Sequence, residues 1–230
     1  MRCSIFTPVC ASLTLGLSAA LLSGALPASL PGPPMICQPF DIGNSSSIGD
    51  VSMNRYDSKK LIADTLEVLS PKAPTLVRME TLRRATVAVA SDPAMAKELT
   101  LRLTSRVLDA DASGKSSAQA WFDAGYLAAS LSEMGVNLGY KPGLDNGCEG
   151  YAWLKKAAAL NDKDAGIEFA CALATHPAMH KGTHETYRSH LARAASLASG
   201  DALANKNIQA HCKNWDVKLD DLKARAGSNK

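Results

Sequence analysis

Histidine is the residue type here with the clearest potential for chemistry, and all five copies lie between His176 and His211. His176, His180 and His184 are spaced by four, so on one continuous helix they would share a face suited to zinc or copper. A proline and a glycine interrupt this segment, and the chain has no His-Glu-x-x-His or Cys-x-x-Cys motif. Metal binding by this cluster is therefore an alternative hypothesis. Histidines that face water are the simpler interpretation, and we expect no cofactor.

Two further motifs suggest ion or phosphate sites but lack essential residues. Residues 109–114 begin like a calcium loop, with carboxylates at alternating positions before a glycine, but Ala120 stands where the closing glutamate belongs. We predict a helix end and a turn instead. The Gly-Lys-Ser of residues 114–116 lacks the first glycine of a phosphate-binding loop and a preceding strand. With no signature nucleophile, the chain is predicted not to be an enzyme.

The N-terminus has the pattern of a secretory signal. Arg2 precedes an apolar stretch, residues 5–22, which small residues follow at 23–25. We expect residues 1–25 to be a signal peptide and the protein to be periplasmic or extracellular, with no stable membrane span after cleavage. An uncleaved anchor is the alternative, although proline and polar residues make the stretch a poor span.

Removal of the signal would leave four cysteines, Cys37, Cys148, Cys171 and Cys212. In an oxidising compartment four cysteines suggest two disulfides, for which three pairings exist. If Cys148 begins one helix and Cys171 lies near the end of the next, those two could meet, which leaves Cys37 with Cys212. Buried free thiols are the alternative.

The composition favours helices and argues against a nucleic-acid partner. Hydrophobic residues make up 46% of the chain, many of them alanine, and aromatic residues only 5%. Alanine loses no side-chain entropy in a helix and lets helices pack closely. The net charge of +3 is small, and no run of basic residues stands out. We therefore expect an all-α fold.

Apolar periodicity and turn residues divide the chain into an arm, a helical domain and a tail. Residues 26–54 are rich in Pro, Gly and Ser and form an extended arm that could pack onto the domain; residues 55–215 form the helical domain and 216–230 the tail. Arg78, Arg83 and Arg84 are predicted to face mostly outward. The predicted helices cover about 57–69, 76–90, 94–108, 116–134, 150–160, 164–175, 183–198 and 201–212.

Residues 118–200 resemble tetratricopeptide (TPR) repeats. The first helix of that repeat carries a large residue, a small one four positions later and a compact one three after that. Two helices fit, with Trp121, Gly125 and Ala128 in one and Ile167, Cys171 and Ala174 in the next. The second helix of the repeat is similar to Leu154, Ala157 and Leu160, and again to Leu191, Ala194 and Leu197. The loop at 135–147 lengthens one unit beyond the usual period of about 34 residues.

The resemblance implies a short solenoid of antiparallel helical hairpins that binds a peptide or protein in a concave groove rather than catalysing a reaction. An irregular helical bundle and a structural envelope protein remain alternatives. Phe122 and Tyr126 would be exposed in such a groove, or else be ordinary core residues. Register with Trp121 places these residues on the concave face: Gln119, Phe122, Tyr126, Ser130, Glu168, Ala172 and His176.

Overall fold

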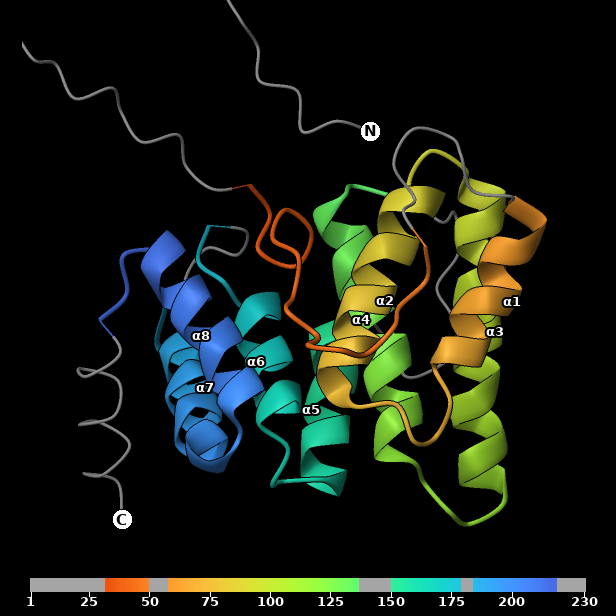
Figure 1. The fold of residues 1–230 in the computed structure, drawn as a ribbon. Coiled ribbons are helices and arrows are strands. Elements are labelled where there is room, and N and C mark those ends of the chain that lie inside the picture. Colours follow the sequence, from red (N-terminus) through yellow and green to blue (C-terminus); the bar gives the residue numbers. More distant parts are fainter. Residues whose placement is uncertain (1–31, 50–57, 137–149, 179–183, 219–230) are drawn as a thin grey trace, which may run out of the picture.

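The computed structural model describes residues 32–49, 58–136, 150–178 and 184–218 (Figure 1). These residues contain eight α-helices, one short 3-10 helix and no strand, which confirms the predicted all-α class. The helices are α1 (Ser58–Val68), α2 (Thr75–Val89), α3 (Pro93–Ala112), α4 (Ala118–Glu133), α5 (Gly150–Leu160), α6 (Ala165–Ala174), α7 (His184–Leu197), η2 (Ala198–Gly200) and α8 (Ala202–Asn214).

Short polar side chains fix where several helices begin. Asp92, Asp164 and Asp201 each accept hydrogen bonds from two backbone N–H groups in the first turn of α3, α6 and α8. Ser117 accepts one from the N–H of Ala120 at the start of α4. These oxygens satisfy N–H groups that have no partner inside the helix. The aspartates and the serine in the interhelical turns therefore define the helix starts.

The segment that begins like a calcium loop is the end of a helix, as predicted. α3 extends four residues beyond its predicted end and includes Asp109 and Asp111 in its last turn. Ser113 follows as the C-terminal cap, and Gly114 adopts a left-handed φ of 70°. Glycine takes this conformation without the strain that a Cβ atom imposes.

Four helices, α2, α4, α6 and α8, contact one another in that order, and we call them the front layer. The most extensive helix pairs are α4–α5 and α6–α7. Figure 1 shows the succession from α1 and α3 at one end to α7 and α8 at the other. One hydrophobic core runs through the whole set, from Met35 in the arm to Cys212 in α8.

Close approach of α4 and α5 depends on two glycines. A Cβ atom on Gly150 would lie 2.3 Å from the backbone nitrogen of Ala129, and one on Gly125 would lie 2.9 Å from the carbonyl oxygen of Gly150. Beside this contact the rings of Trp121 and Trp153 meet edge to face, with centroids 6.5 Å apart. The two glycines thus let the α4 and α5 backbones approach, and the two tryptophans pack beside them.

The second helix differs from its prediction at one arginine. Met79, Leu82 and Val89 are fully buried, as expected, but Arg78 is also buried, with 1% of its surface exposed. Its Nη1 donates to Asp123 Oδ2 at 2.6 Å, and its other nitrogens donate to the Ala73 and Ser70 carbonyls. The prediction that Arg78 faces outward is wrong, because a buried carboxylate and two carbonyl oxygens satisfy its charge and its donors.

Parts of the prediction concern residues outside the described ranges. The predicted signal peptide, residues 1–25, lies there, and so does most of the tail. None of the described helices is both long and apolar enough to cross a membrane.

We predict that Gly150→Ala destabilises the fold by about 1–3 kcal/mol, because the added methyl group must displace the α4 backbone. Gly200→Ala is the matched control, since a Cβ atom there meets nothing within 4 Å. Urea unfolding of both variants checks the prediction. Equal unfolding midpoints for the two variants would contradict it.

Candidate functional site

The arm packs into a groove on the front layer of helices, which we call the arm groove. This groove is the surface of α2, α4, α6 and α8 that contacts residues 35–48. Met35, Phe40 and Ile48 are at most 8% exposed, and the Phe40 ring meets Phe169 of α6 edge to face at 6.2 Å. The arm is coloured orange in Figure 1, where it passes in front of α2. The arm packs onto the domain as expected, but it is not extended throughout, because backbone hydrogen bonds close turns at residues 33–37 and 42–45.

Side chains of the helices bind the backbone of the arm at both ends of the groove. The Met35 N–H donates to Glu133 Oε2 at 3.1 Å, and the Tyr126 hydroxyl donates to the Met35 carbonyl at 3.4 Å. At the other end, Asn207 accepts from the Asp41 N–H at 2.8 Å and donates to the Asp41 carbonyl at 2.9 Å. The amide of Asn207 therefore satisfies both backbone groups of one arm residue.

Glu80 of α2 is the centre of the groove. Its carboxylate, 1% exposed, accepts from the Phe40 N–H at 3.0 Å and from Arg83 and Arg84 at 2.6–2.8 Å. Each arginine uses a further nitrogen to donate to an arm carbonyl, Arg83 to Ile36 at 3.0 Å and Arg84 to Ile48 at 2.8 Å. One carboxylate therefore orients two guanidinium groups that hold the arm.

The two groove carboxylates have opposite pKa shifts. Burial alone would raise the pKa of Glu80, but hydrogen bonds from Arg83, Arg84 and the Phe40 N–H hold it below its usual value. Burial raises the pKa of Glu133 to about 8, since the Met35 N–H opposes that effect only in part. Glu80 is therefore ionised at neutral pH, whereas most Glu133 carboxyls carry a proton.

The residues predicted to line an open groove are mostly buried. Phe122 and Tyr126 are at most 1% exposed, so their prediction as exposed groove residues is wrong, and the alternative of core residues holds. Tyr126 is covered by the arm it binds, and Phe122 packs against Tyr126 at 5.7 Å between ring centroids. Ser130, Glu168, Ala172 and His176 are also buried, and Gln119 is exposed at the start of α4.

Glu168 faces α7 instead of the arm and takes part in a chain of polar contacts. Its Oε2 lies 2.7 Å from His190 Nδ1, and His190 Nε2 lies 2.9 Å from the Tyr151 hydroxyl. Arg193 also contacts Glu168, at 2.9 Å. A carboxylate that orients an imidazole beside a hydroxyl resembles a catalytic arrangement. These contacts join α5, α6 and α7, and burial raises the pKa of Tyr151.

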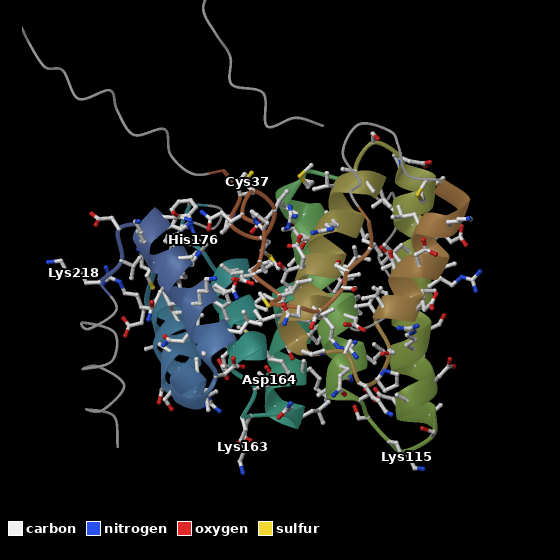
Figure 2. All side chains as sticks on the ribbon, viewed as in Figure 1. Cys37, Lys115, Lys163, Asp164, His176 and Lys218 are labelled. Atoms are coloured by element: carbon white, nitrogen blue, oxygen red, sulfur yellow. The ribbon has the colours of Figure 1, made fainter. Side chains whose placement is uncertain are left out.

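His176 lies in a cluster of rings where α6 ends (Figure 2). Its ring centroid is 3.9 Å from Trp215 and 4.7 Å from Tyr187, whose hydroxyl contacts His211 Nε2 at 2.9 Å. Burial lowers the pKa of His176 to about 4 and that of His211 to about 3, so both rings are neutral at pH 7. Packing among aromatic rings explains why His176 is buried.

The described residues bring no three metal-binding side chains together. No group of three or more His, Cys, Asp or Glu in those ranges could hold a metal ion. His176 and His184 line the same pocket, and His180 lies outside the described residues. Metal binding by the three histidines therefore stays a prediction.

The described cysteines form no disulfide. Cys171 and Cys212 are buried thiols, and burial raises the pKa of Cys212 to about 11. Cys37 is half-buried in the arm and is not joined to Cys212, contrary to the predicted pairing. Because Cys148 lies outside the described residues, its pairing with Cys171 stays a prediction.

Sequence reasoning missed the residues that bind the arm most directly. Arg83 and Arg84 were predicted to face mostly outward, and Glu80, Glu133 and Asn207 were not assigned to any site. The arginines are partly covered, with 16% and 31% of their side chains exposed. One local signal was present, because a glutamate three and four residues before two arginines favours ion pairs on a helix.

With the geometry established, the chain was compared with known proteins. It matches no family model, no curated protein and no solved structure.

We predict that Glu80→Gln lowers the free energy of unfolding by roughly 3 kcal/mol, because it removes the charge that pairs with Arg83 and Arg84 in a buried site. Glu98→Gln is the matched control, since Glu98 contacts Arg102 at 3.5 Å and both side chains are more than half exposed. Glu98→Gln should lower the free energy of unfolding by less than about 1 kcal/mol. Chemical denaturation of both variants measures the difference, and similar losses would argue against a central role for Glu80.

The raised pKa of Glu133 predicts a pH dependence of stability. The folded chain keeps a proton on Glu133 that the unfolded chain releases between its ordinary pKa of 4.5 and about 8. The Glu133 contribution to stability is therefore full below pH 4.5 and is lost as pH rises to about 8, by at most about 1.4 kcal/mol per pH unit. Glu133→Gln should remove this slope in urea unfolding measured across that range. Parallel curves for wild type and variant would show that Glu133 does not titrate in this way.

Proposed function

We propose that this protein is an exported helical-repeat scaffold that binds an extended segment of a protein partner along the arm groove. The observation that carries the proposal is the arm itself, a segment without helix or strand that side chains of the helices hold by its backbone. The front-layer helices are every second α-helix among those described, and α2 contacts α4, α4 contacts α6, and α6 contacts α8. This succession supports the TPR-like part of the proposal.

The contacts with the arm are of the kind that bind extended peptides. Asn207 pairs with the N–H and the carbonyl of Asp41, and Glu80, Glu133, Arg83 and Arg84 bind other backbone groups of the arm. Backbone groups are the same in every sequence, so such bonds give affinity, while side-chain pockets give specificity. A foreign segment could satisfy the same donors and acceptors.

The arm also indicates which sequences the groove prefers. Met35 is fully buried. Phe40, five positions after Met35, packs against Phe169 of α6. Asp41 follows at once and pairs with Lys206 at 2.5 Å. We propose that a partner segment carries a large apolar residue, then an aromatic residue five positions on, then an acid.

A partner must compete with the arm, because both occupy the same groove. A tethered segment acts at an effective concentration of order millimolar, so a free peptide of equal intrinsic affinity displaces little of it. Weakening the arm without changing the groove should therefore reveal binding in trans.

The test uses a fluorescent peptide with the sequence of residues 33–49 and the full chain carrying Phe40→Ala. We predict that this variant binds the peptide at least about tenfold more tightly than wild type does, as measured by fluorescence anisotropy, because its own arm competes less well. If Phe40→Ala prevents folding, Asp41→Lys serves instead, since it places a like charge beside the exposed Lys206.

The control variants distinguish binding in the arm groove from nonspecific peptide binding. Added to Phe40→Ala, Asn207→Ala should abolish peptide binding, whereas Asn205→Ala should leave it unchanged, because Asn205 lies on the same helix and contacts Gln209 instead of the arm. A folded Phe40→Ala chain that binds no peptide, or equal effects of the two asparagine variants, would show that the arm is only part of the fold.

A further inference from the structure

A second concave site lies at the end of the molecule formed by α7 and α8. It is a pocket of about 580 Å³ between the segment that follows α6, the first turns of α7 and the segment that follows α8. Its volume falls in the range of small-molecule sites, roughly 300–1,000 Å³. The residues that line it are His176, Pro177, Ala178, His184, Tyr187, Arg188, Trp215, Asp216, Val217 and Lys218.

Aromatic and imidazole rings form one side of this pocket. His176 lies against Trp215 and Tyr187, and its Nδ1 accepts a hydrogen bond from the Ala178 N–H at 3.2 Å. His211 packs behind His176 and Tyr187, with centroids 5.6 and 6.0 Å away. His176 and Tyr187 are each 3% exposed, so they hold the half-buried ring of Trp215 in place, and Trp215 offers a preformed surface for a planar apolar group.

Positive charge makes up the other part. Arg188 and Lys218 line the pocket, and neither forms a salt bridge with another described residue. Asp216 is the only acid among the described residues that line it. A guanidinium presents two parallel N–H groups that match a carboxylate, so an anion beside the rings would gain charge-assisted hydrogen bonds. Figure 2 labels His176 and Lys218 in this region.

We propose that this pocket binds a small aromatic carboxylate, with the ring against Trp215 and the carboxylate on Arg188 and Lys218. The site is separate from the arm groove and does not depend on the proposed function. Binding of a ligand of about thirteen heavy atoms should have a Kd on the order of 1 mM or lower.

Two probes that differ only in charge test the proposal. Calorimetric titration of the full chain with 2-naphthoate should show saturable binding, and titration with neutral 2-naphthamide should show binding at least about tenfold weaker. Arg188→Gln should weaken naphthoate binding by about tenfold or more, because the exposed Arg188 supplies the anion contact without supporting the fold. Arg102→Gln, an exposed arginine on α3, is the matched control and should leave binding unchanged.

The ring part of the site is tested separately. Trp215→Leu should weaken the binding of both probes. Amide NMR spectra of this variant should report whether the rest of the fold is retained. No saturable naphthoate binding up to ~10 mM would overturn the proposal. So would equal affinity for the two probes, or equal effects of Arg188→Gln and Arg102→Gln.

Discussion

The arrangement of this protein depends on one buried charge. A carboxylate removed from water must be compensated, and Glu80 is compensated by two arginines from its own helix and one backbone N–H from the arm. Because those arginines also bind arm carbonyls, the requirement to satisfy Glu80 fixes the path of residues 36–48 over α2. The arm in turn brings Met35 and Phe40 into the core, so the electrostatic and hydrophobic parts of the fold are coupled.

Polar contacts elsewhere have a related role. The front-layer helices are rich in alanine, and small side chains interlock only weakly, so apolar packing alone permits helices to slide or rotate. Arg78 with Asp123 joins the loop before α2 to α4, and Glu168 with His190 joins α6 to α7. These directional bonds select one register among several with similar apolar burial.

The sequence was sufficient for the local structure and insufficient for the site. Apolar periodicity and turn residues predicted the eight described helices with boundaries close to those observed, because both signals arise within a few neighbouring residues. The arm groove combines residues far apart, as Asp41 and Asn207 are separated by 166 positions, and no periodicity encodes that contact. Arg78 shows the same limit, since its burial depends on Asp123, a residue 45 positions away. Tyr126 was predicted to be exposed, and its covering by the arm could not be seen from its own helix.

The position of the arm in the chain also has a consequence for folding. The arm precedes all the helices that the structure describes, yet Asn207, which binds Asp41, lies on α8, the last of them. The helix pairs α4–α5 and α6–α7 can form from near neighbours, whereas closing the arm onto α8 orders a loop of most of the chain, which is slow on entropic grounds. A nascent chain therefore holds its most apolar arm residues without their complete binding site until α8 has been synthesised. The Asp41 contact with Asn207 must therefore wait for α8, whereas the arm contacts with Glu80 and Glu133 need only α2 and α4.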